Sequence, residues 1–451
     1  MNDFQTRLNL VIPGGAHTYS RGQDQFPANA PQILSRGLGA RVWDPEGNEY
    51  LDYGMALRAV TLGYANPRVN QAAIRQIENG NNLTRASVVE LEAAELLTQI
   101  IPGAEMVKFA KNGSNATTAA AKIARAYTGK RFICVPRQQP FFSFDDWFIG
   151  TTPILRGVPQ EHRSSTLMFD YNDIQSLQLL FDAYPGQIAA VMLEPATTVT
   201  PCCINCQELT ANSPCLRCPN KEKNFLHQVQ ALCGKEDALF ILDEMITGFR
   251  WALEGASSYF GVKADLMTFG KGMANGFSIA AVVGRREVME VGAIDKPGSE
   301  RVFLLSSTHG GEMAGLGAFI ETVNIYQEED VCRKLWDFGL LLKNQVNDLA
   351  IELGIQDYFE IVGPGISLNY VTRDKFGDVC LEYRTLFSQE MLRNRVLMPW
   401  IAQSFSHNSE ELDQTLCAAE SALKVYVRAI EEGVDSYLDG PSIKPVFRKF
   451  N

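Results

Sequence analysis

Two charged residues each lie at the end of a short apolar run. Asp243 follows Ala238–Leu242, and Lys271 follows Leu266–Phe269 with one glycine between them. Such runs predict strands buried on both faces of a sheet, and ligands gather beyond the carboxyl ends of these strands. An amine and a carboxylate at that edge suit pyridoxal phosphate, because the lysine would form a Schiff base with its aldehyde and the carboxylate would keep its pyridine nitrogen protonated. The alternative is a surface acid and a surface lysine that never meet.

A tripeptide at the start of a predicted helix is a candidate anion site. Gly113, Ser114 and Asn115 follow the apolar run Met106–Ala110 and precede a helical pattern over Ala116–Tyr127. Free backbone N–H groups in a first helical turn, together with a serine hydroxyl, bind anions, and phosphate is the natural occupant. The alternative is an ordinary helix N-cap.

The middle of the chain alternates between helical patterns and short apolar strands. The predicted strands are Met106–Ala110, Phe132–Val135, Ala189–Leu193, Leu239–Leu242, Leu266–Phe269 and Ile279–Val283. This alternation predicts an α/β fold, with a largely parallel sheet covered by helices.

The two ends of the chain have other patterns. Residues 1–60 are rich in Gly, Pro and Asn and contain a hairpin-like stretch over 40–52. The C-terminal elements are predicted at Gly315–Gln327, Asp330–Leu353, Gly365–Thr372 and Ser409–Glu432. We therefore predict an N-terminal segment (1–60) that contributes to the small domain and active site, a large cofactor-binding domain (61–311), and a small α+β domain (312–451). Proline and charge beyond residue 441 predict a loosely held tail.

Composition excludes several classes of protein. With 46% hydrophobic and 21% charged residues, the chain is typical of soluble globular proteins. Its net charge of −11 argues against nucleic acid or anionic membranes as partners. No stretch approaches the ~18 continuous apolar residues of a membrane span, and the N-terminus does not resemble a secretory signal. We expect a cytoplasmic enzyme.

Five cysteines lie close together in an otherwise polar stretch. Cys203 and Cys206 form one pair with two residues between them, and Cys215 and Cys218 form another, while Cys202 is left over. Four thiolates at this spacing typically bind a structural zinc ion, and the metal would then fold the segment between the pairs. Disulfides, free thiols and an iron–sulfur cluster are the alternatives. We predict a zinc-knuckle-like insertion over 200–222.

Four motifs occur together in one order along the chain. They are Gly113-Ser114-Asn115, Leu242-Asp243-Glu244-Met245-Ile246-Thr247-Gly248-Phe249-Arg250, Phe269-Gly270-Lys271-Gly272 and Ser307-Thr308-His309-Gly310-Gly311. This order and spacing resembles class III pyridoxal-phosphate aminotransferases, and most of all glutamate-1-semialdehyde aminomutase and its aminotransferase relatives. The resemblance covers nearly the whole chain except about 200–222. It implies a fold type I transferase, with a mainly parallel seven-stranded sheet and a smaller α+β domain.

The resemblance also implies roles for single residues at the reacting centre. Lys271 corresponds to the Schiff-base lysine, which also moves the proton between substrate and cofactor, and Asp243 to the carboxylate at the pyridine nitrogen. Met245 is expected to pack against one face of the ring. Glu194, at the end of a predicted strand, corresponds to an acidic residue near the substrate.

Other implied roles concern the cofactor's phosphate and the second ring face. Gly113, Ser114 and Asn115 match the phosphate-binding turn, although the family usually has an acidic residue where this chain has Asn115. Thr308 matches a threonine that reaches the phosphate of the neighbouring subunit's cofactor, which implies a homodimer with shared active sites. Where the family usually stacks a tyrosine on the ring, this chain offers Phe141.

Amino transfer from an amino-acid donor to a carbonyl acceptor is the expected activity, with a keto sugar, keto acid or aldehyde as acceptor. Arg21 and Arg58 are candidates to bind substrate anions, because arginine pairs bidentately with carboxylates, although both could be structural. One alternative is the glutamate-1-semialdehyde 2,1-aminomutase reaction within a single substrate. Another, of a different class, is an inactive zinc-stabilised binding protein on the same fold.

Overall fold

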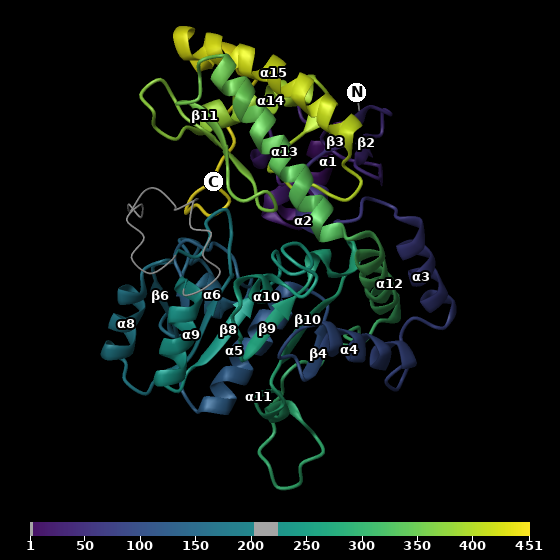
Figure 1. The fold of residues 1–451 in the computed structure, drawn as a ribbon, viewed down its shortest axis with the longest axis vertical. Helices are drawn as coiled ribbons and strands as arrows, with labels where there is room; N and C mark the ends of the chain where they lie inside the picture. Colours follow the sequence, from purple (N-terminus) through teal and green to yellow (C-terminus); the bar gives the residue numbers. More distant parts are fainter. Residues whose placement is uncertain (1–2, 203–223) are drawn as a thin grey trace. The chain divides into compact units, whose positions relative to one another are not determined.

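The computed structural model describes residues 3–202 and 224–451. The chain forms two compact units. Unit 1 comprises Met1–Asn66 and Lys334–Arg448, and unit 2 comprises Pro67–Arg333 and Lys449–Asn451. Figure 1 shows the elements of each unit along the chain.

Unit 2 is built on a seven-stranded sheet in the order β4-β10-β9-β8-β7-β5-β6. Figure 1 labels β4, β10, β9, β8 and β6 of this sheet. The strands are β4 (Met106–Ala110), β5 (Phe132–Pro136), β6 (Thr166–Phe169), β7 (Ile188–Leu193), β8 (Leu239–Asp243), β9 (Leu266–Phe269) and β10 (Ala280–Gly284). Neighbours from β9 to β6 pair in parallel, whereas β10 is antiparallel to both β4 and β9. The predicted mainly parallel sheet is therefore confirmed. Its central strands are buried along their whole length, which explains their continuous apolar runs.

Unit 2 also contains helices, several of which pack on this sheet. They are α3 (Pro67–Glu78), α4 (Val88–Ile100), α5 (Gly113–Thr128), α6 (Asp146–Ile149), α7 (Gln160–Arg163), α8 (Ile174–Ala183), α9 (Phe225–Lys235), α10 (Ala256–Phe260), α11 (Arg286–Met289) and α12 (Met313–Glu329). Helix α5 packs on β7, β9 and β10, and α9 packs on β7 and β8. Helix α12 packs against α3 and α4, so unit 2 extends to Arg333. The predicted division instead placed residues 312–333 in the C-terminal domain. The roles predicted for the domains, such as cofactor binding by the large one, stay predictions.

Unit 1 contains two small sheets and the remaining helices. Strands β1 (Arg36–Leu38), β2 (Arg41–Trp43), β3 (Glu49–Asp52) and β13 (Val396–Leu397) form one sheet, and β11 (Phe359–Val362) pairs with β12 (Asn369–Thr372). The helices are α1 (Phe4–Val11), α2 (Met55–Arg58), α13 (Val331–Glu352, which begins in unit 2), α14 (Leu381–Arg393) and α15 (Ser409–Glu432). The predicted hairpin over 40–52 is present as β2 and β3, which pair antiparallel.

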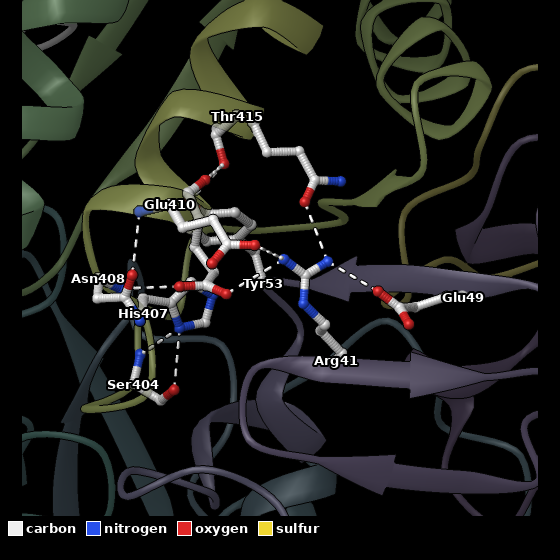
Figure 2. A network of polar contacts seen from close by, with 10 residues as sticks. Arg41, Glu49, Tyr53, Ser404, His407, Asn408, Glu410 and Thr415 are labelled. Carbon is white, nitrogen blue, oxygen red and sulfur yellow. Dashed lines mark hydrogen bonds and ion pairs between the residues drawn. The ribbon is translucent and has the colours of Figure 1, made fainter.

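A polar network joins the hairpin of unit 1 to the start of α15 (Figure 2). Arg41 of β2 forms ion pairs with Glu49 at 2.9 Å and Glu411 at 3.2 Å. The hydroxyl groups of Tyr53 and Thr415 lie 2.8 Å apart in a hydrogen bond. The sheet and the helix are therefore held together by charge and hydrogen bonding as well as by their shared apolar core.

The C-terminal tail is not loosely held, contrary to the prediction from its composition. The backbone N–H of Lys444 donates to the carbonyl of Asp24 at 2.9 Å, and Arg448 forms an ion pair with the Asp24 carboxylate. The N–H of Ile443 donates to the hydroxyl of Thr385 at 2.9 Å. These partners lie far away in the sequence, so the composition of the tail alone does not reveal them.

Candidate active site

Asp243 is the last residue of β8 and is only 3% exposed. Its Oδ1 accepts a hydrogen bond from the Thr268 hydroxyl on the neighbouring strand β9 at 2.8 Å, and another from the Met245 N–H at 3.1 Å. Burial raises the pKa of the Asp243 carboxyl to about 6, and the charge of Lys271 is the strongest of the influences that oppose this rise. The carboxyl group is therefore fixed in orientation through one oxygen.

Lys271 follows β9 after a single glycine and begins the short 3-10 turn Lys271–Ala274. Its φ of 44° lies in the left-handed region, which residues other than glycine rarely adopt. Strained backbone of this kind is concentrated at functional sites. Because the lysine charge acts on Asp243, the structure brings the two predicted residues into the same part of unit 2.

The Met245 thioether connects three of the predicted segments. A Cβ atom on Gly113 would lie 2.9 Å from the Met245 Sδ, and one on Gly270 would lie 2.6 Å from it. A side chain at either position would therefore have to displace the sulfur. Met245 is buried and packs with Ala110, at the end of β4. The first turn of α5 and the residue before Lys271 thus meet around one side chain.

Helix α5 begins earlier than predicted, so its glycine and serine are part of the first turn rather than lying before it. Asn112 is the N-cap, and its side chain accepts a hydrogen bond from the Asn115 N–H at 3.0 Å. The buried Ser114 Oγ accepts one from the Phe144 N–H at 3.0 Å, which leaves its own O–H to donate. A 16-residue helix presents its positive end here, together with a hydroxyl donor.

Glu194 directly follows β7 and is buried. Leu193 pairs in register with Leu242, so Glu194 and Asp243 end neighbouring strands at the same level. Gln139 brackets the Glu194 backbone: its Oε1 accepts from the Glu194 N–H at 2.7 Å, and its Nε2 donates to the Glu194 carbonyl at 2.9 Å. Gln139 was not among the predicted site residues, since a glutamine in a polar loop carries no pattern of its own.

Glu244 was part of a recognised motif but had been given no role. It is fully buried, and its carboxylate accepts hydrogen bonds from the N–H groups of Ala256 at 2.9 Å and Ser257 at 2.6 Å and from the Thr247 hydroxyl. The chain that follows Asp243 is thereby tied to the start of α10. Burial raises the pKa of Glu244 as well.

Four further residues were predicted for the ring face, the phosphate and the substrate: Phe141, Thr308, Arg21 and Arg58. Phe141 is 46% exposed, and its ring is nearly perpendicular to that of Phe148, with the two ring centroids 6.2 Å apart. Thr308 is exposed, and its carbonyl accepts from the Asn82 side chain at 3.0 Å. Arg21 and Arg58 belong to unit 1.

The predicted metal ligands Cys203, Cys206, Cys215 and Cys218 lie outside the described residues. Within the part of the chain that the structure describes, no group of three or more His, Cys, Asp or Glu side chains could hold a metal ion. The same residues include no helix that is long and apolar enough to cross a membrane.

The residues gathered in unit 2 fit pyridoxal phosphate. Asp243 has one oxygen committed to two protein donors and can offer the other to a protonated ring nitrogen. Lys271 provides an amine for the aldehyde, and the start of α5 with Ser114 provides donors for the phosphate. Met245 fills the space between the two glycines, where it can contact the face of a planar ring.

Comparison with known families identifies the chain. Residues 19–199 and 218–362 match the family described as Aminotransferase class-III. The chain belongs to this family. The match is interrupted between residues 199 and 218, within the stretch predicted to be an insertion. Class III membership makes the chain a pyridoxal-phosphate-dependent aminotransferase or aminomutase.

Curated relatives carry two kinds of name. Glutamate-1-semialdehyde 2,1-aminomutase of Alkaliphilus oremlandii is 31% identical over 93% of this chain and 97% of its own length. The enzyme of the same name from Acetivibrio thermocellus is 36% identical, but only over 63% of this chain and 64% of its own length. The 3-aminobutyryl-CoA aminotransferase of Cloacimonas acidaminovorans is 30% identical over 94% of this chain and 96% of its own length.

Solved structures share the fold. The PLP internal aldimine form of the FumI protein of Sphingopyxis sp. MTA144 superposes with a TM-score of 0.81 at 26% identity, covering 95% of this chain and 97% of that one. A transaminase with PLP bound gives a TM-score of 0.80 at 21% identity, over 95% of this chain and 97% of the other. The fold of pyridoxal-phosphate transaminases, with its mixed seven-stranded sheet, is therefore present here.

Proposed function

We propose that the protein transfers an amino group from an amino-acid donor to a carbonyl acceptor. The observation that carries this proposal is the buried, hydrogen-bonded Asp243 carboxyl at the end of β8, with Lys271 following the adjacent parallel strand β9. A second candidate is the glutamate-1-semialdehyde aminomutase reaction, which the names of two relatives favour. An inactive binding protein on the same fold is disfavoured because both reactive residues are present.

The residues of the site have separable tasks. Bound pyridoxal phosphate supplies an electron-accepting ring that stabilises negative charge on the substrate carbon. Asp243 holds a proton at the ring nitrogen, and its hydrogen bond from Thr268 keeps the carboxyl group aligned. Lys271 holds the cofactor between turnovers and moves the proton to and from the substrate carbon. Ser114 donates a hydrogen bond to the phosphate. Glu194 lies at the carboxyl-terminal end of the neighbouring strand β7.

Two arginines of unit 1 are assigned the binding of substrate anions. Arg21 lines a cavity in that unit, and Arg58 ends the short element α2. A guanidinium group binds a carboxylate through two parallel hydrogen bonds, which favours a carboxylate-bearing donor. The acceptor is a keto sugar, a keto acid or an aldehyde, and Phe141 is proposed to stack on the cofactor ring.

A half-reaction distinguishes the candidate functions. Purified holoenzyme is mixed with single amino acids, without acceptor, and its visible absorbance is followed. We expect at least one donor to remove the band and to release one equivalent of the matching oxo acid. For the aminomutase, glutamate 1-semialdehyde should instead be converted to its amino isomer without release of a free oxo acid. An inactive binding protein gives neither result with any donor.

We also propose that the enzyme is a homodimer with shared active sites. Support comes from the match of Thr308 to a residue that reaches the neighbouring subunit's cofactor, and from the exposure of its side chain in the single chain. Each site would then need both chains, because the partner's threonine completes the phosphate contacts. Sedimentation at assay concentration should show a dimer, whereas a fully active monomer would exclude this arrangement.

A structural zinc ion is proposed for Cys203, Cys206, Cys215 and Cys218. The described residues on either side support a closed insertion, since the Phe225 N–H donates to the Cys202 carbonyl at 2.8 Å and so joins the two ends of the segment. Four thiolates leave no open coordination position, so the metal would stabilise the insertion and take no part in catalysis. We expect one zinc per chain in protein prepared without chelator, and disulfides at these positions would contradict it. The cytoplasmic location stays a prediction from the sequence.

A further inference from the structure

Four consecutive residues of unit 1 have left-handed backbone conformations. The φ angles of Met55, Ala56, Leu57 and Arg58 are 39°, 48°, 61° and 68°, and none of these residues is glycine. With ψ angles of 49° and 41°, Ala56 and Leu57 are close to an ideal left-handed helix. The left-handed form is disfavoured for each of these residues, because it brings the Cβ atom too close to the following carbonyl oxygen. A strained turn of this kind persists only where its surroundings hold it in place.

Asp52 and Tyr64 hold the turn from one side. The Asp52 carboxylate accepts hydrogen bonds from the Gly54 N–H at 2.7 Å and the Met55 N–H at 3.0 Å. The Tyr64 hydroxyl donates to Asp52 at 2.7 Å and accepts from the Ala56 N–H at 3.0 Å. Three successive backbone N–H groups thus donate to this pair, of which Asp52 is buried and Tyr64 partly buried.

Packing holds the same turn through other contacts. The Trp400 indole N–H donates to the Gly54 carbonyl at 3.0 Å. Met55 is fully buried beside Val60 and Ala402. Position 54 has little room for a side chain, because a Cβ there would lie 2.9 Å from the Asp52 Oδ1.

The held turn forms part of the wall of a cavity of about 1030 Å³ within unit 1. This volume is at the upper end of the range for small-molecule sites. Asp52, Ala56, Leu57, Tyr64 and Trp400 line it, and so does Arg21. The strained residues Ala56 and Leu57 therefore line a cavity that is large enough for a ligand.

Charge in the cavity wall favours an anionic ligand, because the acidic side chains of the wall, Asp24 and Asp52, have partners of their own. Arg36 also lines the cavity, but its guanidinium lies over the Trp43 ring at 3.8 Å, and Asp24 is paired with Arg448. Arg21 lies near enough to Tyr64 for its charge to act on that hydroxyl. A carboxylate bound at Arg21 would therefore share the cavity with the apolar side chains of the strained turn.

We propose that Asp52 and Tyr64 are positioning residues, which hold the left-handed turn so that Ala56 and Leu57 set the shape of a carboxylate-binding cavity at Arg21. Neither residue is assigned contact with the reacting atoms. The inference rests on the proposed function, in which Arg21 binds a substrate carboxylate. Beyond that function, we assign to Ala56 and Leu57 the control of how large a substrate group fits next to the bound carboxylate.

The first test removes one hydroxyl. Tyr64→Phe eliminates both the donor to Asp52 and the acceptor for Ala56, so the turn should relax. We expect the dissociation constant of glutarate, an unreactive dicarboxylic acid, to rise tenfold or more in calorimetry with the holoenzyme. The KM of the carboxylate donor should rise similarly, while kcat and the resting absorbance remain unchanged. Tyr50→Phe is the matched control, because the Tyr50 hydroxyl contacts Asp44 at 3.4 Å and does not line the cavity.

A second substitution, Ala56→Gly, distinguishes a loss of the turn's conformation from a general loss of stability. Glycine adopts positive φ without strain, so Ala56→Gly should favour the turn even when the hydroxyl is missing. In the Tyr64→Phe background this second change should restore glutarate affinity to within threefold of wild type. Wild-type affinity in Tyr64→Phe alone, a loss that Ala56→Gly does not rescue, or equal losses of kcat and resting absorbance would overturn the inference.

A second variant keeps the test valid if Tyr64→Phe does not fold. Leu57→Ala leaves every backbone contact of the turn in place and enlarges the cavity. We expect the ratio of adipate to glutarate affinity to rise threefold or more, and an unchanged ratio would contradict the inference. Failure of the proposed function is distinguishable, since it appears as the absence of any half-reaction in the wild type, whereas diacid binding needs no turnover.

Discussion

Replacing Lys271 with alanine is expected to lower turnover at least ~1000-fold, because a positioned acid–base group alone contributes about 100- to 10,000-fold and this lysine also holds the cofactor. The variant should still bind pyridoxal phosphate through the start of α5 and Asp243, but without a covalent link to the protein. Steady-state assays and the absorbance of the bound cofactor measure the two effects.

Lys263→Ala is the matched control for this variant. Lys263 is an exposed lysine of the same unit, a few residues before β9, so its removal should leave activity and spectrum unchanged. Substantial activity in Lys271→Ala, or a remaining cofactor link that borohydride can trap, would show that another amine forms the Schiff base.

Asp243→Asn is expected to retain the cofactor but lose most of its activity. An amide fits the hydrogen bonds from Thr268 and Met245, yet it carries no negative charge to keep a proton on the ring nitrogen. An unprotonated ring accepts electrons poorly, so the step that removes the substrate proton should slow most. Near wild-type single-turnover rates with the best donor would rule out this role.

Although Asp243→Asn should lower activity, it should raise the free energy of unfolding. The Asp243 carboxyl has a pKa of about 6 in the folded protein, raised by burial from an ordinary value of 3.8. Between these values the folded state binds more protons than the unfolded state, so the free energy of unfolding falls as pH rises from about 4 to 6. Free of cofactor, Asp243→Asn should therefore be more stable than the wild type above pH 6, by about 2–3 kcal/mol.

Denaturant unfolding of the two cofactor-free proteins from pH 4 to pH 8 measures this difference. Carboxyl groups that do not interact with Asp243 titrate alike in both proteins, so the comparison isolates Asp243 together with its coupled neighbour Glu244. The difference should shrink toward pH 4, where the wild-type carboxyl is protonated and resembles the amide. A constant difference across the range would mean that burial does not raise this pKa.

Elements with strong local patterns were predicted well from the sequence. Strands β8 and β9 are buried throughout, so their apolar runs mark their positions and ends. Helix α15 was predicted over the residues it occupies, because its apolar stripe is regular and Asn408 caps its start. The family motifs then placed the cofactor chemistry at the ends of the two strands.

Elements without such patterns were missed. Strand β6 is an edge strand with only partly buried central residues, so it lacks the continuous apolar run of its neighbours. Helix α14 buries polar residues such as Gln389 and Glu390 together with its apolar ones, which hides its helical period. Side-chain partners also escaped prediction where they lie far apart along the chain, as Gln139 and Glu194 do. The left-handed turn at 55–58 contains no glycine to indicate it.

Mapping the cofactor's attachment point tests the central claim most directly. Wild-type holoenzyme is reduced with borohydride and digested, and the peptide that carries the cofactor is sequenced by mass spectrometry. The assignment of Lys271 as the Schiff-base lysine predicts one stable adduct per chain, on Lys271. An adduct on any other lysine, or none in protein that shows the visible band, would contradict the assignment of this site.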